Sequence, residues 1–383
     1  MINRSQRLVL SARDAGSAGH IAALAANAAL HGMDSLIVAE GAAHFYLETR
    51  RVPHLTADAW LNAISTPEES KDTIALAGEK LSQLGACAVV CGRSSLQGEG
   101  IDRTVIAAAR LLDIPSFVVQ DFWGDVWAED CRPDHYLVID DLAGQLTRQS
   151  TCADVHVIGS PKHAQYMHID FQDLRKKGRQ ALELGQDSLV IGYFGQDILH
   201  LQGYHQVLRD IGHVVGQQDQ VSLFYKPHPR ESEDAYACTL SLLRAGGASP
   251  TIVKNLEIEI AIATADVVLS CFSTIGLDAA YMMCAPDAPE VGIICADYPE
   301  EVSGFWRPAT GLSAFPLVID GIALPVSDRN TLETAIQTGL TPAERKRQAN
   351  ACRTIFGNSD DPIEKAYKLI ERIVRSDHLR VRA

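Results

Sequence analysis

The sequence lacks the features that mark membrane-spanning, secreted and cysteine-clamped proteins. None of its uninterrupted apolar runs approaches the ~18 residues that span a bilayer. The apolar stretch near the amino terminus is too short for a signal peptide, so we expect a cytoplasmic protein. The nine cysteines are scattered singly, without a CxxC pair or zinc-type spacing to histidine. This pattern favours buried, reduced thiols over disulfides or a cysteine-bound metal.

Basic residues are also scarce relative to acidic ones. The 34 lysines and arginines face 48 aspartates and glutamates, which gives a net charge of −14. A nucleic-acid partner is not expected, because phosphate backbones require a basic surface. Repeats and low-complexity tracts are absent too. What the chain does have is ordinary globular composition, 46% hydrophobic and 21% charged, over 383 residues. That length predicts about two to three domains.

Apolar runs typical of buried strands alternate along the chain with segments of helical period. The predicted strands are residues 7–12, 34–40, 87–92, 114–121, 135–140, 155–160, 187–196, 221–229, 251–255, 266–272 and 290–296. The predicted helices are residues 18–32, 66–85, 100–113, 203–216, 256–265, 274–283, 331–340 and 360–374. Strands that alternate with helices of this length predict parallel sheets with helices on both faces.

The strand–helix series restarts near residues 159–174, which predicts two α/β domains. We expect a Rossmann-like acceptor-side domain over residues 1–160 and a Rossmann-like nucleotide-sugar-binding domain over residues 161–360. The last segment, 361–383, is expected to form a helix that returns to the first domain. Two such domains facing each other would form a ligand cleft between the carboxyl ends of their sheets.

The first candidate site is the loop after the first predicted strand. It contains Asp14, Gly16, Ser17 and Gly19, and a helix follows from His20. Glycines allow close approach of a ligand, and a helix start offers free amide groups. The G-x-x-G spacing does not meet the dinucleotide fingerprint. His20 is a candidate general base, with a purely structural histidine as the alternative.

The second candidate site is the segment FYKPHPRE, residues 224–231. An apolar strand ends in Lys226, His228 and Arg230, and two prolines fix the backbone between them. Alternation along an extended chain places these three side chains on one side. Three cationic or donor groups at the end of a strand suit a diphosphate. A solvated proline-rich turn is the alternative.

Two more loops complete the predicted nucleotide side. One strand opens into Ser273, Thr274 and Gly276, and Asp278 follows one helical turn later. Hydroxyl and amide groups at a helix start suit phosphate, and a carboxylate suits ribose hydroxyls. An ordinary capped helix is the alternative. Another strand ends at Gly195 and Gln196, which are weaker candidates for nucleotide contact.

Carboxylates and aromatic rings follow two strands of the first half. We expect them to form a wall that contacts a carbohydrate-like acceptor, with ordinary core packing as the alternative for the aromatic rings. The acceptor-side candidates are Gly16, Ser17, Gln97, Glu99, Asp102, Asp121 and Trp123. Asp14, Asp121 and Asp125 rival His20 as the catalytic base.

Several of these motifs resemble those of the GT-B glycosyltransferase superfamily. Residues 15–20, AGSAGH, are similar to the first loop of the peptidoglycan N-acetylglucosaminyl transferases and of the UDP-sugar hydrolases of pseudaminic acid synthesis. KPHPR and residues 273–279 resemble two motifs of capsule polysaccharide transferases and CDP-glycerol glycerophosphotransferases. This resemblance implies diphosphate contacts from Lys226, His228, Ser273 and Thr274, and a ribose contact from Asp278. It places His20 near the reacting centre.

The resemblance implies a GT-B enzyme that moves a sugar from a nucleotide-activated donor to an unknown acceptor. We expect no metal and no separate cofactor, because cationic side chains would neutralise the leaving nucleotide. The alternatives are a nucleotide-sugar hydrolase, a non-hydrolysing epimerase and a non-catalytic sugar-nucleotide-binding protein. Arginines near the carboxyl terminus suggest either weak contact with a membrane or a solvated helix end: Arg372, Arg375, Arg380 and Arg382.

Overall fold

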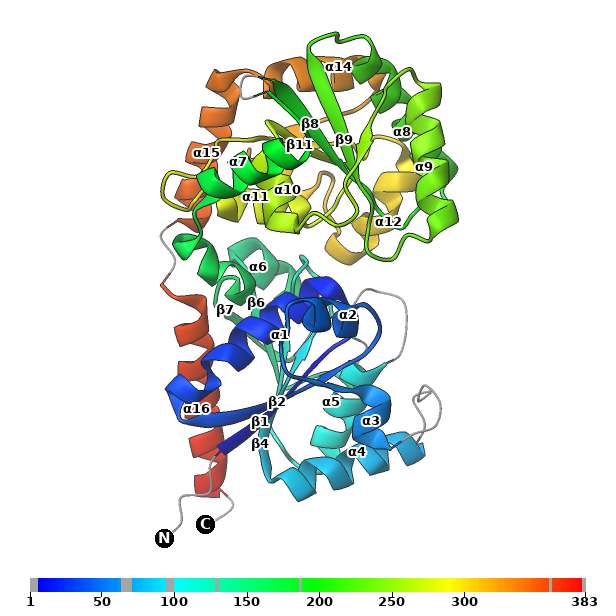
Figure 1. Cartoon of the computed structure of the whole chain (residues 1–383). Coiled ribbons are helices and arrows are strands. Elements are labelled where there is room, and N and C mark those ends of the chain that lie inside the picture. The colour runs from blue at the N-terminus through cyan, green and yellow to red at the C-terminus, as the bar shows by residue number, and fades with distance from the viewer. Residues whose placement is uncertain are drawn as a thin grey trace. The chain divides into compact units, whose positions relative to one another are not determined.

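The chain divides into two compact units (Figure 1). The computed structural model describes residues 6–62, 71–93, 100–127, 131–185, 188–357 and 360–380. Unit 1 comprises Met1–Ala164 together with Ser359–Ala383, and unit 2 comprises Gln165–Asn358. The predicted helix of residues 66–85 lies partly outside the described residues, and its described part is α4.

Unit 1 contains a parallel sheet of seven strands in the order β3-β2-β1-β4-β5-β6-β7. Its strands are β1 (Gln6–Ala12), β2 (Met33–Ala39), β3 (Leu55–Thr56), β4 (Ala86–Gly92), β5 (Ser116–Val119), β6 (His135–Val138) and β7 (Asp154–Val157). Its helices are α1 (Ala15–Asn27), α2 (Gly41–Thr49), α3 (Ala57–Leu61), α4 (Lys71–Leu84), α5 (Ile101–Leu111), α6 (Asp141–Ser150) and α16 (Pro362–Arg380). Parallel strands joined by helices confirm the predicted α/β class.

The last helix, α16, belongs to unit 1 and packs against α1 and β4 (Figure 1). Its apolar positions at helical spacing are buried: Ile363, Tyr367, Ile370 and Val374. The Tyr367 hydroxyl donates a 2.6 Å hydrogen bond to the Leu24 carbonyl of α1. The pattern of residues 360–374 therefore identified the face on which α16 packs.

The predicted helix of residues 18–32 is wrong at both ends. The helix α1 begins three residues earlier, at Ala15, and it ends at Asn27. A short 3₁₀ turn, Ala28–His31, follows it, and Gly32 then reverses the chain with a φ of 68°. Such a left-handed conformation suits glycine, which has no Cβ to clash with the backbone.

Unit 2 contains a parallel sheet of six strands in the order β10-β9-β8-β11-β12-β13. Its strands are β8 (Leu189–Phe194), β9 (Val221–Lys226), β10 (Thr251–Ile252), β11 (Val267–Ser270), β12 (Gly292–Cys295) and β13 (Leu324–Pro325). Its helices are α7 (Phe171–Ala181), α8 (Gln202–Gly216), α9 (Glu233–Ala245), α10 (Ile258–Thr264), α11 (Ile275–Met282), α12 (Glu300–Thr310), α13 (Pro316–Ile319), α14 (Arg329–Gly339) and α15 (Pro342–Phe356).

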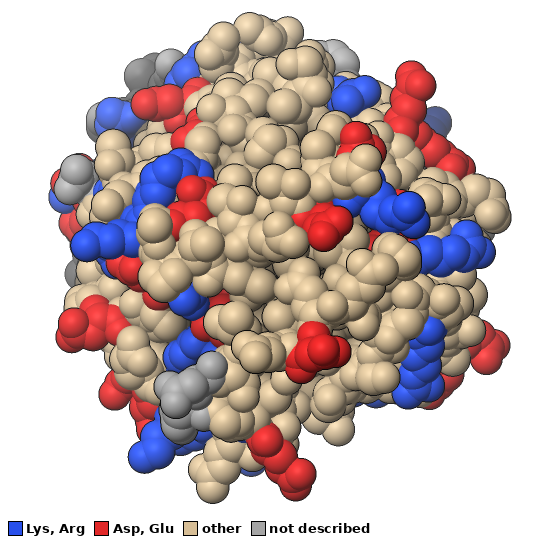
Figure 2. All heavy atoms as spheres, turned by 90° about the horizontal axis from the view of Figure 1, so that it is seen from above, with Lys and Arg blue, Asp and Glu red and all other residues tan. Residues whose placement is uncertain are grey.

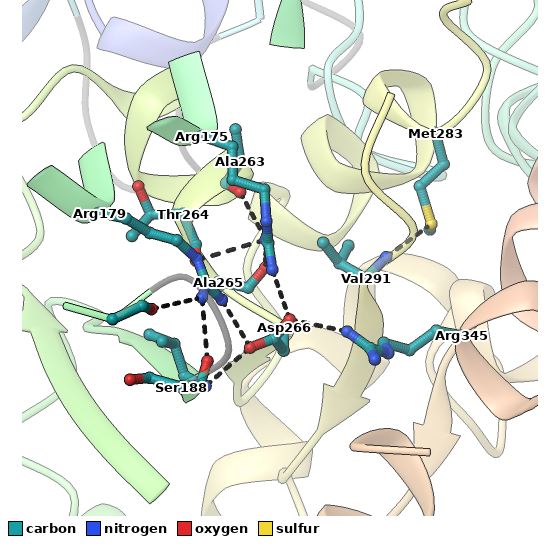
Figure 3. Close-up of polar contacts among 12 residues, drawn as sticks. Arg175, Arg179, Ser188, Ala263, Thr264, Ala265, Asp266, Met283, Val291 and Arg345 are labelled. Carbon is teal, nitrogen blue, oxygen red and sulfur yellow. Dashed lines mark hydrogen bonds and ion pairs between the residues drawn. The ribbon is translucent and has the colours of Figure 1, made fainter. Parts of the chain in front are cut away.

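A buried ionic cluster fastens α7 and α15 to the start of β11 (Figure 3). The carboxylate of Asp266 accepts hydrogen bonds from Arg175 (2.6 Å), Arg179 (2.8 Å) and Arg345 (2.7 Å). It also accepts a 2.8 Å bond from the backbone amide of Val190 in β8. Asp266 is 3% exposed, and its bonds to Arg179 and to the Val190 amide are buried, whereas those to Arg175 and Arg345 are partly buried. The cluster lies at the amino edge of the sheet and acts as a structural anchor.

Acidic and basic side chains are interspersed over the face of the molecule in Figure 2. The excess of negative charge is thus not gathered into one large patch on that face. Among the described residues, no helix is long and apolar enough to cross a membrane.

Candidate functional site

The loops after β8, β9 and β11 share the carboxyl edge of the unit 2 sheet. These strands are neighbours in the order β9-β8-β11, and all run parallel. Because adjacent strands lie about 4.8 Å apart, the ends of β9 and β11 are roughly 10 Å from each other. The Pro-His-Pro turn and the start of α11 therefore lie at the same edge of one sheet, two strands apart, as the nucleotide hypothesis requires.

Gln196 joins the loop after β8 to the loop after β11. Its side-chain Oε1 accepts hydrogen bonds from the amide groups of Cys271 (3.1 Å) and Phe272 (3.0 Å). The backbone amide of Gln196 donates a 3.2 Å hydrogen bond to the Tyr204 hydroxyl. Gln196 is buried. The Gln196 side chain thus braces the two loops, and contact of the loop at Gly195 and Gln196 with a nucleotide stays a prediction.

Glu231 fixes the conformation of the Pro-His-Pro turn. Its carboxylate accepts bonds from the Tyr225 hydroxyl (2.8 Å), the His228 amide (2.5 Å) and the Thr239 hydroxyl (3.3 Å). Burial raises the pKa of Glu231, while the first two donors favour its charged form. Gly195 allows this approach, since a Cβ there would lie 2.6 Å from the Glu231 carboxylate. Gly195 therefore serves packing within the edge.

The turn orients His228 and Arg230. The Nδ1 atom of His228 accepts a 3.2 Å hydrogen bond from the Arg230 amide, so the neutral ring carries its proton on Nε2. An imidazole Nε2–H is a suitable donor for a phosphate oxygen. The Arg230 Nε lies 3.6 Å from the Asp197 carboxylate in the loop after β8, and both side chains are exposed.

Lys226 points toward the β10 side of the sheet. Its Nζ donates to the carbonyl oxygens of Val253 (3.2 Å) and Lys254 (3.1 Å), which follow β10. Burial lowers the pKa of Lys226 to about 8, and the nearby charge of Glu259 opposes that shift. Since β10 and β11 lie on opposite sides of β8 and β9, Lys226 is directed away from the start of α11. Its contact with a diphosphate stays a prediction.

The start of α11 offers amide groups at the same edge. Thr274 is the N-cap residue, and the Ser273 hydroxyl accepts a 3.2 Å bond from the Ile275 amide. The amides of Gly276 and Leu277 donate to the carbonyl oxygens of Ser273 (3.3 Å) and Thr274 (2.9 Å), so this turn offers mainly the partial positive charge of a helix start. Such a terminus suits a phosphate group.

Two other residues of this motif have packing positions. A Cβ at Gly276 would lie 2.7 Å from Leu317, so this glycine allows α11 to pack closely against α13. Asp278 is only 4% exposed. Gly276 thus serves helix packing and Asp278 is buried, and their predicted contacts with a nucleotide stay predictions.

In unit 1, the two glycines of the first loop accommodate two side chains. A Cβ at Gly16 would collide with the carboxylate of Asp121, which follows β5. A Cβ at Gly19 would lie 3.0 Å from the aliphatic chain of Lys162. Gly16, a predicted acceptor-side residue, therefore lies at the start of α1 in contact with the Asp121 carboxylate.

Asp121 has the most strongly perturbed carboxyl group near this loop. Burial, together with the negative charges of Asp14 and Asp125, raises its pKa to about 7. The positive charges of Lys162 and Arg93 oppose the shift. The Asp121 carboxyl accepts no hydrogen bond from the residues that the structure describes. A carboxyl group with this pKa can exchange a proton near neutral pH, as a general base must.

Asp125 is engaged in a buried ion pair, which sets it apart from Asp121. Its carboxylate lies 2.6 Å from the Arg93 guanidinium, and both side chains are buried. Its backbone carbonyl accepts a 2.7 Å bond from the Gln120 amide group. Asp125 was one of our candidate bases, and the structure shows it anchoring the loop of residues 121–127.

Trp123 and Asp102 are inside the unit, which corrects the expected acceptor wall. The Trp123 ring is 0% exposed, and its Nε1 donates to Asp140 at 2.8 Å. Asp102 is 2% exposed and accepts a 2.5 Å bond from the Ser11 hydroxyl. Neither side chain offers a surface to a sugar. Gln97 and Glu99, the other members of that wall, lie outside the described residues.

The other first-loop candidates lie along the start of α1. The Asp14 carbonyl accepts bonds from the Ala18 amide (2.9 Å) and the Ser17 hydroxyl (3.0 Å). Ser17 also packs against Gly92 at the end of β4. His20 is 2% exposed, and its ring lies edge-on to His163 at 6.3 Å. His20 is thus buried beside His163, and its role as a general base stays a prediction.

Three residues of these edges were not predicted. Arg93 follows β4 directly and balances Asp125. Lys162 lies far from the first loop in sequence, but its aliphatic side chain packs against α1 at Gly19. Glu231 is the last residue of the segment FYKPHPRE. A carboxylate next to three cationic or donor groups was the sequence feature from which its role could have been predicted.

Comparisons with known proteins identify the architecture. No protein-family model matches the chain, and no curated protein matches it by sequence. Among solved structures, UDP-GlcNAc 2-epimerase from Neisseria meningitidis bound to UDP-GlcNAc covers 97% of this chain and 100% of its own, with a TM-score of 0.64 and 14% identity. The chain adopts the GT-B fold.

Two further GT-B structures cover nearly the whole chain. MurG from Acinetobacter baumannii covers 96% of this chain and 99% of its own, with a TM-score of 0.57 and 14% identity. A glycosyltransferase from Rickettsia africae ESF-5 covers 97% and 99%, with a TM-score of 0.63 and 10% identity. The predicted GT-B architecture is confirmed, and the candidate loops are strand–helix loops of its two sheets.

Proposed function

We propose that this chain is a glycosyltransferase that uses a nucleotide-activated sugar, with the nucleotide diphosphate bound at the carboxyl edge of unit 2. The observation that carries the proposal is the shared edge of β9, β8 and β11. It places the His228 donor, the Arg230 charge and the positively polarised start of α11 at one edge of the sheet. These groups match a diphosphate in charge and in hydrogen-bonding capacity.

The comparisons support a nucleotide-sugar substrate. One similar structure is described as bound to UDP-GlcNAc, and another is described as a glycosyltransferase. At 10–14% sequence identity these structures establish the fold alone. The proposal of a nucleotide-sugar substrate therefore also requires side chains and helix ends in this chain that suit such a substrate. In this chain the local chemistry is cationic and amide-rich at the unit 2 edge, and carboxylate-rich after β5.

The proposed reaction requires a general base, and within unit 1 the pKa of Asp121 suits this role. The base takes the proton of the acceptor hydroxyl while that oxygen forms a bond to the anomeric carbon of the sugar. The bond between this carbon and the diphosphate oxygen breaks, and its electron pair leaves with the nucleotide. His228 and the α11 amides stabilise the negative charge that develops on the diphosphate. The proposal needs no metal for this step.

Epimerisation of a nucleotide sugar is a second candidate. The similarity to a UDP-GlcNAc 2-epimerase favours it, and so does the raised pKa of Asp121, which suits exchange of a proton with a carbon atom. In this reaction the base removes a proton from the sugar ring as the diphosphate leaves. A proton is then delivered to the opposite face of the same ring carbon while the diphosphate oxygen bonds again to the anomeric carbon, and no acceptor is needed.

Product analysis by NMR in D₂O separates these reactions. The full chain is incubated with UDP- and CDP-sugars, with and without an acceptor extract, in buffer containing EDTA. A new glycoside together with free nucleotide, formed only with the extract, supports the transferase. Deuterium in a sugar that remains attached to its nucleotide supports the epimerase. Free sugar without an acceptor indicates a hydrolase, and binding without turnover indicates a non-catalytic protein. Absence of both binding and turnover contradicts the proposal.

A further inference from the structure

Two histidines and an aspartate converge at the amino ends of β6 and β7 in unit 1. The parallel register pairs His135 with Asp154, and His156 follows two residues later on β7. Side chains two residues apart in a strand project to the same face, so all three lie on one side of the sheet. One ligand atom from each lies within 4.8 Å of the other two.

The distances suit a tetrahedral metal ion. His135 Nδ1 lies 3.3 Å from His156 Nε2 and 3.6 Å from the Asp154 carboxylate. Zinc bonds of about 2.0–2.2 Å place neighbouring tetrahedral ligands about 3.3–3.6 Å apart. Two of the three separations thus match the edges of a zinc coordination sphere, and small rotations of the exposed Asp154 side chain would adjust the third.

The surroundings hold the imidazoles and leave one side open. The His135 ring stacks on Phe117 of β5, with the ring centroids 4.8 Å apart. The His135 side chain is 12% exposed, whereas the Asp154 side chain is 75% exposed. An ion placed among the three would therefore have protein on one side and water available for the fourth position.

The charges near the cluster are mixed. Asp154 supplies one negative charge, and the positive charges of Arg148 and Arg372 act on His156. The Arg148 guanidinium donates a 3.0 Å bond to the Val155 carbonyl, which holds it at the backbone of β7. These arginines oppose a cation, so we expect micromolar affinity and not the tighter binding of a structural zinc finger.

We propose that His135, Asp154 and His156 bind one divalent transition-metal ion of the Zn²⁺ type, with water as the fourth ligand. The imidazole and carboxylate donor set suits Zn²⁺, whereas Mg²⁺ and Ca²⁺ prefer oxygen ligands alone. The ion would fasten the edge strand β7 to β6. The cluster lies at the amino edge of its sheet, whereas the candidate loops follow the carboxyl ends, so this proposal does not depend on the proposed function.

The test is metal binding by the untagged full chain after removal of metals with a chelator. Titration with Zn²⁺ should show one equivalent bound, and Co²⁺ should give the visible absorption of a tetrahedral nitrogen and oxygen site. Because the Asp154 side chain is exposed, Asp154→Asn leaves the fold intact. We expect it to weaken Zn²⁺ binding at least about tenfold, since even loss of an outer-shell partner typically costs about 10–100-fold. His156→Ala should weaken binding further.

A second histidine pair in unit 1 provides the matched control. His44 Nδ1 lies 2.8 Å from His54 Nε2, but this pair has no convergent third ligand among the described residues. The variant His54→Ala should keep wild-type affinity. The proposal is overturned if wild type and Asp154→Asn bind Zn²⁺ equally, because the three side chains would then form only a hydrogen-bonded cluster. Equal losses in His54→Ala and His156→Ala would also overturn it.

Discussion

Replacing Asp121 with asparagine should stabilise unit 1 at neutral pH while removing the proposed base. The carboxyl lies against the start of α1, and its pKa is raised from 3.8 to about 7. A folded-state pKa above the unfolded value means that the folded chain holds this proton more tightly. The resulting stabilisation is present at low pH and is lost as the pH rises from about 4 to about 7. Asparagine is nearly isosteric, and it remains neutral throughout.

The size of the effect follows from the pKa values. Each unit of pKa difference corresponds to about 1.4 kcal/mol, and the interval from pH 5 to pH 7 covers about two units. The advantage of Asp121→Asn over wild type in free energy of unfolding should therefore grow by about 3 kcal/mol between pH 5 and pH 8. Effects of titrating groups that do not interact with Asp121 cancel in this difference, provided that the fold is unchanged.

Urea unfolding followed by tryptophan fluorescence measures this difference. Unit 1 contains Trp60, Trp123 and Trp127, and unit 2 contains only Trp306, so the signal mainly reports unit 1. The same variant should lose about 10²–10⁴-fold in turnover, the usual contribution of a general base. A stability difference that is equal at pH 5 and pH 8 would refute the reasoning about Asp121. Wild-type turnover in the variant would return the role of base to His20 or Asp14.

Two further predictions concern unit 2. Asp266→Asn should lower the free energy of unfolding of unit 2 by about 3–5 kcal/mol, because the arginines around it lose their counter-charge. The control is Asp173→Asn, which removes one partner of an exposed ion pair with Lys177. Hydrogen exchange of β11 amides measures the loss, and equal protection in the two variants would count against the anchor. If Lys226 contacts the diphosphate, nucleotide affinity should fall as the pH rises through about 8, where this side chain loses its charge. Lys226→Arg should abolish that dependence in calorimetric titrations, and an unchanged pH profile would exclude Lys226 from the site.

Most strands could be predicted from the sequence because they are buried on both faces. Residues 87–92 and 266–272 are nearly continuous apolar runs, and they form β4 and β11. Several helices were not predicted. The helix α7 has many charged and few apolar residues, and Arg175 and Arg179 fix it through Asp266, which local periodicity does not reveal. The helix α15 likewise contains few apolar residues.

The candidate site was only partly predictable. The segments that contain His228 and Ser273 were recognisable because their residue types suit phosphate. The roles of Gln196 and Asp125 were not, because they depend on partners that only the folded chain brings close: Cys271, Phe272 and Arg93. The environment of Asp121 depends on burial and on four charged neighbours, three of them from other segments of the chain, so its raised pKa was not predictable either.

The central claim is that the carboxyl edge of unit 2 binds a nucleotide diphosphate. Isothermal titration of the full chain with UDP and CDP tests it directly, with His228→Ala compared with the control His213→Ala on α8. The account predicts binding by wild type and by His213→Ala, and an affinity at least about tenfold weaker for His228→Ala, since a hydrogen bond to a charged group contributes about 1.5–3 kcal/mol. Equal nucleotide affinity in the two variants would contradict it.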